Sequence, residues 1–228
     1  MKIGIESNIL RYYLRNTYFI CGTAYAGKST MVAMLADRFN MVHCGENYHG
    51  THQDQFIDPI RQPNLSYFKT MKDWQEFVNR TPDEYDRWIT GGSEEAAQIE
   101  IAELLRLSDT GRVIVDTNIP LDILREISDY RRVAVMLSPQ AMSVEKFFDR
   151  TDEDKQFLLN HINQAEDPER TMANFRACIA KINSEEHYRE FVDSGFFQII
   201  REQTDTDTRE ETLLKLAEHF QLDSSQSE

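Results

Sequence analysis

The sequence lacks the features that would place a protein in a membrane or outside the cell. Nowhere do eighteen apolar residues follow one another, so we expect no membrane-spanning helix. The amino-terminal segment has no apolar core that ends in small residues, which argues against a secretory signal. Cysteine is scarce, and Cys21, Cys44 and Cys178 show no C-x-x-C spacing, which favours buried, reduced thiols over a disulfide framework or a zinc site. Together these absences predict a cytoplasmic protein.

Positive charge is also in short supply. Lys and Arg number 25 against 39 Asp and Glu, the formal net charge is -14, and no cluster of basic residues compensates. Such an acidic surface repels nucleic acid backbones and anionic lipids, so we expect neither nucleic acid nor a membrane as a partner. The expected partner is a small molecule, bound by a monomer or a homodimer.

The composition is that of an ordinary folded protein, with 40% apolar and 11% aromatic residues. A chain of 228 residues can bury one sizeable core. We therefore expect a single domain over residues 1–222 and a disordered tail over 223–228.

Short apolar segments alternate with helical patterns along the chain. Strands are predicted over residues 17–21, 41–44, 112–116, 132–137 and 196–201. Helices are predicted over residues 29–40, over 65–107 with breaks at Thr81-Pro82 and Gly91-Gly92, over 121–130, over 144–192 with an interruption at 166–168, and from a capping box of Thr208 and Glu211 through 220. This alternation predicts an α/β fold with a mainly parallel five-stranded sheet and helices on both faces. Ligands bind such folds at the carboxyl ends of the strands.

A glycine-rich loop stands between the first predicted strand and helix, where it matches the Walker A pattern. Its residues are Gly22, Thr23, Ala24, Tyr25, Ala26, Gly27, Lys28 and Ser29, with Thr30 following. Glycines let the backbone curl so that successive amides face phosphate oxygens, and the start of the helix adds a positive end. The lysine supplies a mobile charge for the β- and γ-phosphates, and the serine hydroxyl ligates magnesium. The loop therefore predicts binding of ATP with Mg²⁺.

The sequence resembles the P-loop kinases of the nucleoside monophosphate and small-metabolite type, such as those that act on shikimate and gluconate. The resemblance rests on the loop from Gly22 to Thr30, on the aspartate that ends the third predicted strand, and on the charged helical stretch before the last strand. It implies a P-loop NTPase-type three-layer sandwich and transfer of the γ-phosphoryl group of ATP to a small metabolite, nucleoside or nucleotide. It also implies a helical acceptor-binding insert at about 61–110, a lid at about 148–176, and a segment over 204–207 that wraps the adenine. The acceptor segment matches no subgroup signature, so the acceptor stays open.

Two carboxylates occupy positions where this chemistry needs them. Asp116 ends the third predicted strand, where it can hold magnesium together with Ser29. Glu46 follows the second predicted strand, where it can orient the acceptor hydroxyl and take its proton. The plainer interpretations are an aspartate that starts a turn and a glutamate on a solvated loop.

Arginines can balance the charge of the transferring phosphoryl group. Arg150 and Arg170 are the predicted catalytic arginines of the lid, with Arg176 as a further candidate. In the insert, the candidates for binding an anionic acceptor are Arg61, Arg80 and Arg87. Each of these side chains has the alternative of pairing with a neighbouring acid.

Two further functions use the same loop. One is a regulatory ATPase or switch without a small-molecule acceptor, and the other is a nucleotide-binding protein that has lost catalysis. A GTPase is disfavoured because the sequence has no Asn-Lys-x-Asp motif and no glycine three residues after Asp116.

Overall fold

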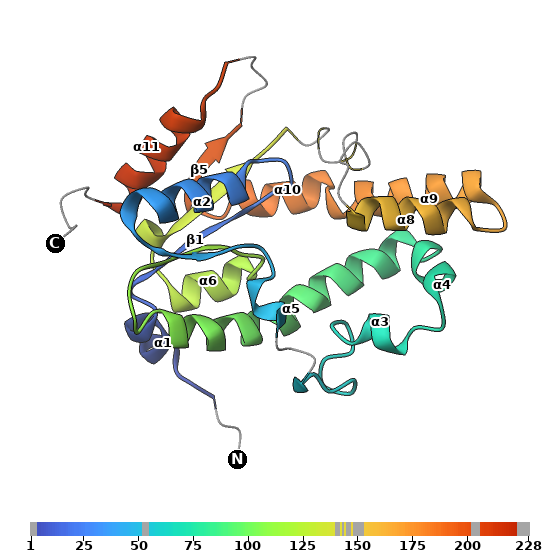
Figure 1. The fold of residues 1–228 in the computed structure, drawn as a ribbon, viewed down its shortest axis with the longest axis horizontal. Coiled ribbons are helices and arrows are strands. Elements are labelled where there is room, and N and C mark those ends of the chain that lie inside the picture. Colours follow the sequence, from blue (N-terminus) through green and yellow to red (C-terminus); the bar gives the residue numbers. More distant parts are fainter. Residues whose placement is uncertain are drawn as a thin grey trace.

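The three central strands of the sheet are apolar because helices cover both of its faces. The computed structural model (Figure 1) describes residues 4–51, 55–139, 142, 144, 147, 153–201 and 206–222. Its five parallel strands follow the order β2-β3-β1-β4-β5. The strands are β1 (Thr17–Gly22), β2 (Val42–Cys44), β3 (Val113–Asp116), β4 (Val133–Leu137) and β5 (Phe197–Ile200). The predicted α/β class and parallel five-stranded sheet are confirmed.

The register places the ends of the central strands side by side. Ile20 of β1 is opposite Asp116 of β3, and Gly22 of β1 is opposite Met136 of β4. The residues that leave β1, β3 and β4 therefore meet at one edge of the sheet, as expected for parallel strands.

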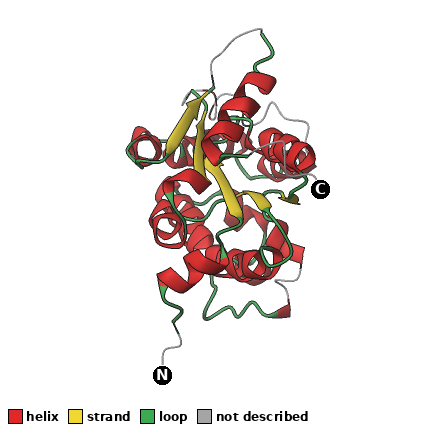
Figure 2. Cartoon of the chain, turned by 90° about the vertical axis from the view of Figure 1, so that its left-hand side faces the viewer, coloured by secondary structure: helices red, strands yellow, loops and turns green. Residues whose placement is uncertain are grey.

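Helices lie on both faces of the sheet (Figure 2), and an apolar core fills the space between the sheet and the helices on each face. On one face lie α2 (Lys28–Phe39) and α11 (Arg209–Phe220), and on the other lie α1 (Ser7–Tyr13), the carboxyl-terminal half of α5 (Pro82–Leu107), α6 (Leu121–Ile127) and α10 (Glu185–Val192). Short 3-10 turns, η1 (Tyr48–Thr51) and η3 (Tyr130–Arg132), connect these layers.

A third core forms a separate helical region on the right-hand side of Figure 1. This region comprises α3 (Tyr67–Thr70), α4 (Trp74–Val78), the amino-terminal half of α5, α8 (Glu153–Asn163) and α9 (Pro168–Ile182). Phe77 of α4 and Phe175 of α9 are among its buried rings, and Lys181 Nζ lies 3.5 Å from Asp83 Oδ1 across α9 and α5. The described part of the predicted lid thus packs against the predicted insert through a buried core.

The predicted break at Gly91-Gly92 is wrong, because α5 runs through both glycines as one helix of 26 residues. A Cβ at Gly91 would lie 2.4 Å from Asn64 Nδ2, so the glycine allows the preceding loop to approach the helix closely. Asn64 is held there by Glu95, whose carboxylate accepts a hydrogen bond from Asn64 Nδ2 at 2.6 Å. This contact offsets the cost of about 1 kcal/mol for each glycine inside a helix.

The predicted capping box of Thr208 and Glu211 does not form. Thr208 is the N-cap residue of α11 but its side chain accepts no capping hydrogen bond, while Asp207 Oδ1 accepts from the amide of Arg209 at 3.0 Å. Glu211 instead pairs with Lys215, one turn later, at 2.7 Å. Two other predicted helices also differ: α6 ends at Ile127, and the long charged stretch is broken a second time between α9 and α10.

The three cysteines are free and buried, as predicted. Burial raises the pKa of the Cys21 and Cys44 thiols to about 12 and that of Cys178 to about 11, so all three stay protonated at neutral pH. Within the described ranges, none of the helices combines the length and the apolar character required to cross a bilayer.

Candidate functional site

The Walker A loop, residues 22–30, begins at Gly22, the last residue of β1. Any other residue at this position would collide with the backbone of Met136. Gly22 has φ of 125°, and a Cβ there would lie 2.0 Å from the carbonyl oxygen of Met136. Tyr25 and Gly27 also have positive φ, 64° and 90°. Left-handed residues in such a turn direct successive amides toward a shared concave side, which is how backbone loops bind anions.

The loop is fastened to the ends of two strands. Thr23 Oγ1 accepts a hydrogen bond from the Ser138 amide at 2.8 Å, and Ser138 Oγ donates to the carbonyl of Ala24 at 2.8 Å. Arg201, just past β5, donates to the carbonyl of Tyr25 at 2.7 Å. The loop is therefore held in its conformation before any ligand binds, which lowers the entropic cost of binding.

Lys28, Ser29 and Asp116 converge at the start of α2. Lys28 is only 9% exposed, and its Nζ donates to the carbonyl of Thr23 at 3.2 Å and lies 3.9 Å from Asp116 Oδ1. Ser29 Oγ donates to Asp116 Oδ2 at 2.7 Å. The predicted metal ligands, Ser29 and Asp116, are therefore neighbours in space although 87 positions separate them in the sequence.

One oxygen of the Asp116 carboxylate accepts no hydrogen bond from the described residues, and the nearest cation among them, Lys28 Nζ, lies 3.9 Å from it. Asp116 is 1% exposed, and the oxygen without a hydrogen bond is Oδ1. Burial raises the pKa of Asp116, while Lys28 and the hydrogen bond from Ser29 oppose that rise. A buried carboxylate oxygen without a partner costs free energy unless a cation or a donor joins it. The oxygen donors of Asp116 and Ser29 fit a magnesium ion, a hard cation that prefers such ligands.

Glu46 lies at the same edge of the sheet. The Asn118 side chain donates from Nδ2 to Glu46 Oε1 at 3.1 Å. Both residues line a cavity of about 470 Å³, here called the loop cavity, together with the Walker A residues Lys28 and Ser29. The structure thus brings Glu46 to the Walker A loop.

Comparisons with protein-family models, with curated proteins and with solved structures find no match to this chain. The function is therefore inferred from the chemistry of the site. The site combines a Walker A loop held by hydrogen bonds, the buried carboxylate of Asp116 and the nearby carboxylate of Glu46.

A larger cavity, of about 1050 Å³, adjoins the loop cavity. The two share Gly22, Asn118, His187 and Phe191 among their lining residues. Helices α5 and α10 and the segment after β3 form the walls of the larger cavity, and His187 Nε2 of α10 lies 2.9 Å from Asp86 Oδ1 of α5. The larger cavity thus opens beside the point where the Walker A loop meets the Glu46–Asn118 pair.

The sequence did not single out Asn118 or His187. Asn118 stands two residues after Asp116, so its position beyond a strand end was a usable signal. His187 lies in a charged amphipathic helix with nothing in its spacing to mark it. Only the packing of α10 beside α5 brings it to the site.

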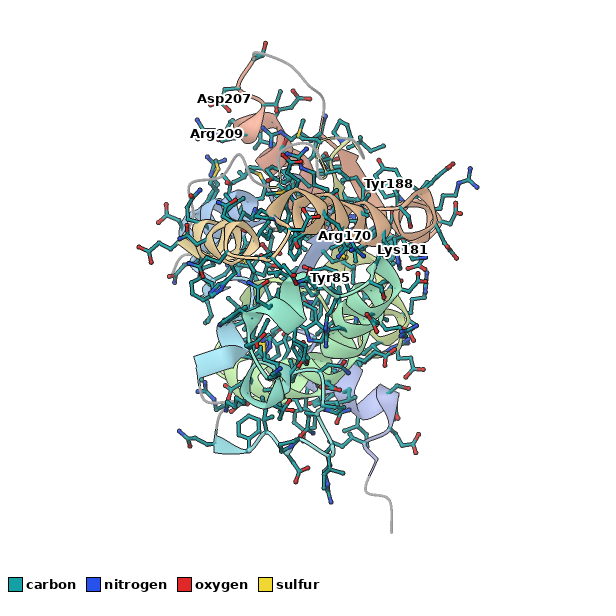
Figure 3. All side chains as sticks on the ribbon, turned by 90° about the vertical axis from the view of Figure 1, so that its right-hand side faces the viewer. Tyr85, Arg170, Lys181, Tyr188, Asp207 and Arg209 are labelled. Carbon is teal, nitrogen blue, oxygen red and sulfur yellow. The ribbon has the colours of Figure 1, made fainter. Side chains whose placement is uncertain are left out.

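The opposite side of the Walker A loop borders a third cavity, of about 320 Å³. Thr206 and Asp207, from the segment predicted to wrap adenine, line this cavity with Thr30 and Arg201, whereas Thr204 lies outside the described residues. Asp207 and Arg209 lie together at the top of Figure 3, and the hydrogen bonds from Arg209 lower the pKa of Asp207 to about 2. The cavity is therefore bordered by an ion pair on its outer side.

The two predicted lid arginines that the structure describes, Arg170 and Arg176, are not brought to the loop. Arg150 lies outside the described residues. Arg170 is exposed in the first turn of α9, twelve residues before Ile182, which lines the loop cavity. At 1.5 Å per residue, Arg170 lies about 18 Å along the helix from that position. Arg176 is likewise exposed and borders a depression formed by the ends of α8 and α9.

Other cations occupy the places near the loop. Lys155 Nζ lies 5.6 Å from the ring centre of Tyr25, and Arg201 holds the loop as described. In the insert, the guanidinium of Arg80 stacks 3.6 Å over the Tyr67 ring, while Arg61 and Arg87 are exposed. None of these three insert arginines lines the loop cavity or the larger cavity in the described part of the chain.

A buried acid lies behind Asp116. Glu100 of α5 is 3% exposed, and burial raises its pKa to about 7, with a further rise from the charge of Asp116 and an opposing hydrogen bond from Thr117. His49 Nδ1 lies 4.0 Å from Glu100 Oε2, too far for a hydrogen bond, and burial lowers the pKa of His49. The contact between Glu100 and His49 is therefore not a strong ion pair at neutral pH.

Proposed function

We propose that the protein is an ATP- and magnesium-dependent kinase of the P-loop type, which transfers the γ-phosphoryl group of ATP to a small hydroxyl-bearing acceptor. The observation that carries the proposal is the 2.7 Å hydrogen bond from Ser29 to one oxygen of the Asp116 carboxylate. The other oxygen of this carboxylate is buried, accepts no hydrogen bond within the described part of the chain and lies 3.9 Å from Lys28 Nζ. The parallel sheet with helices on both faces supports a P-loop NTPase-type sandwich, because its Walker A loop stands at the carboxyl end of β1.

In this proposal each residue near the loop has a distinct task. The loop amides and Lys28 bind the phosphates of ATP, with Lys28 balancing charge that develops during transfer. Ser29 and Asp116 hold Mg²⁺, directly or through water. Magnesium, when bound, neutralises charge on the phosphate oxygens and fixes their position.

Glu46 serves as the base in the proposed reaction. Its carboxylate orients the acceptor hydroxyl and accepts the proton as the oxygen attacks phosphorus. The hydrogen bond from Asn118 fixes one carboxylate oxygen of Glu46, which leaves the other for the acceptor.

The larger cavity favours a kinase over a switch protein. A nucleotide switch needs the loop and the metal ligands but no second chamber for a reactant. Here a cavity of about 1050 Å³ adjoins the loop cavity at Gly22 and Asn118, next to Glu46. Its volume suffices for a small metabolite.

Substitution of Lys28 by Ala tests the proposal. We expect Lys28→Ala to lower ATP-dependent phosphorylation at least about 100-fold, because one positive group that stabilises the transition state is lost. Thermal shift with Mg-ATP and ATP consumption measure binding and turnover, and circular dichroism checks that the fold is intact. Lys72→Ala, which removes an exposed lysine of the helical region, is the matched control. Unaltered turnover in Lys28→Ala, or no binding of Mg-ATP by the wild type, would refute the proposed function.

A further inference from the structure

The larger cavity also says what kind of acceptor the enzyme takes, an inference that rests on the proposed kinase function. One wall is a single face of α5, where Asp86, Thr90 and Glu94 recur every four residues. The facing wall is α10, which contributes Glu186 and Glu190, again four residues apart. Carboxylates therefore line the cavity from two sides.

The described positive side chains that line the larger cavity are few, and each contacts another group of the protein. Seven carboxylates and two arginines are among its described lining residues. Arg189 pairs with Glu185 of its own helix, and Arg125 Nη2 donates to the carbonyl of Ser194 at 3.0 Å. His187, between the two cavities, is bound to Asp86. Among these lining residues the carboxylates outnumber the arginines by seven to two, so the described lining carries a net negative charge.

Nearby cations outside the cavity are also committed elsewhere. Lys181 pairs with Asp83 at 3.5 Å, and Arg80 stacks on Tyr67. Lys28 belongs to the Walker A loop, where it would contact the phosphates of ATP. An anionic acceptor would thus be repelled by walls whose carboxylates outnumber their arginines.

We propose that the acceptor is a small hydroxyl compound without an anionic group, and that a positively charged amino group on it strengthens binding. The carboxylates accept hydrogen bonds from its hydroxyl or ammonium groups. In the reaction, the acceptor oxygen forms a bond to the γ-phosphorus, the bond from that phosphorus to the β,γ-bridging oxygen breaks, ADP leaves with the electron pair, and the hydroxyl proton passes to Glu46.

A screen with matched compounds tests this inference. Each scaffold is offered in an uncharged, an amino and an acidic form: glucose, glucosamine and glucuronate; glycerol, 3-amino-1,2-propanediol and glycerate; ethylene glycol, 2-aminoethanol and glycolate. ATP consumption with Mg²⁺ is measured for each, after thermal shift has established that Mg-ATP binds. We expect turnover with uncharged or amino members and at least about tenfold lower kcat/KM for the acidic member of the same scaffold.

Each outcome is decisive. Turnover of an acidic member above its uncharged and amino counterparts would overturn the inference and leave the kinase proposal standing. Binding of Mg-ATP without turnover of any compound would count against both. Failure to bind Mg-ATP would remove the proposed function itself, and the inference with it.

A variant shows whether the walls set the preference. With the best amino acceptor, we expect Glu94→Gln to raise KM about fivefold and leave kcat unchanged, since one attractive charge is lost outside the reacting atoms. Glu103→Gln, on the same helix but outside the lining of the two cavities, is the control. If both variants have the wild-type KM, or if Glu94→Gln improves use of the amino compound, the wall carboxylates do not select the acceptor.

Discussion

The sheet with its Walker A loop and the helical region beside it are stabilised in different ways. The loop is held by hydrogen bonds from Ser138 and Arg201, groups that stand at the ends of neighbouring strands. The helical region is held by aromatic rings such as Phe77, which contacts Trp88 and Phe175 at centroid distances of 5.2 and 6.2 Å. The first arrangement depends on backbone geometry at single positions, and the second on side-chain volume. Substitutions at these positions should therefore fail in different ways.

The largest effect is expected for Gly22→Ala. The new methyl group would meet the carbonyl oxygen of Met136 at 2.0 Å, in a backbone conformation with φ of 125°. We expect a loss of about 4 kcal/mol in stability and complete loss of Mg-ATP binding. Chemical denaturation and calorimetric titration measure the two effects. Gly111→Ala, where a Cβ would meet nothing within 4 Å, should leave both close to wild type. Normal nucleotide binding in Gly22→Ala would contradict the geometry of the loop.

Phe77→Ala should damage the helical region without touching the loop. The Phe77 side chain is 3% exposed, and its removal leaves a cavity in the third core. We expect the free energy of unfolding to fall by about 4 kcal/mol, while Mg-ATP affinity measured well below the melting temperature changes less than about twofold. A loss of nucleotide affinity as large as that of Gly22→Ala would show that the two regions are not independent. Phe68→Ala, an exposed ring of the same cluster, is the milder control.

Glu46→Gln should separate turnover from nucleotide binding. The amide keeps the shape of the side chain but cannot accept a proton, so we expect kcat to fall about 100-fold and the Kd for Mg-ATP to change little. Steady-state kinetics and calorimetric titration give the two numbers. Asp58→Asn, an exposed acid outside the lining of the loop cavity and the larger cavity, is the control. Equal losses in turnover and affinity would reject Glu46 as the base.

The smallest effect is expected for Glu100→Gln, and it appears as a change in pH dependence. The pKa of Glu100 is raised to about 7 from 4.5, so between these values the folded protein binds more protons than the unfolded chain. The contribution of this group to stability therefore falls as pH rises. Between pH 5.5 and 8 this contribution falls by about 2 kcal/mol in the wild type. In Glu100→Gln the fall should be absent, so the free energy of unfolding should decrease less between the two pH values. Denaturation curves of wild type and variant at the two pH values test it, and parallel slopes would contradict the assigned titration.

The sheet and the loop could be predicted from sequence because they depend on local signals. Short β-rich runs mark the strands, and the Walker A spacing marks the turn between β1 and α2. The positions of Asp116 and Glu46 beside the loop followed from the rule that parallel strands end at one edge. These predictions needed no knowledge of how distant side chains pack.

The remaining features depend on contacts between segments far apart in the chain. The glycines of α5 suggested a break, whereas Asn64 makes them the point of a close approach. Thr208 and Glu211 had the spacing of a capping box, but the Glu211 side chain pairs with Lys215, and Asp207 accepts from the Arg209 amide at the start of the helix. Helix α1 gave no signal in the sequence, since its short amphipathic turn is stabilised by packing against α6 and by hydrogen bonds from Arg11 to the carbonyls of Arg125 and Glu126. His187 belongs to the site for the same long-range reason, through the packing of α10 beside α5.

The unbroken α5 has a mechanical consequence. Its 26 residues span about 39 Å and connect the aromatic core, at Tyr85, with the core on one face of the sheet, at Leu104. Asp86, Glu94 and Glu100 therefore lie on one continuous helix, and a change that tilts this helix would displace all three carboxylates together.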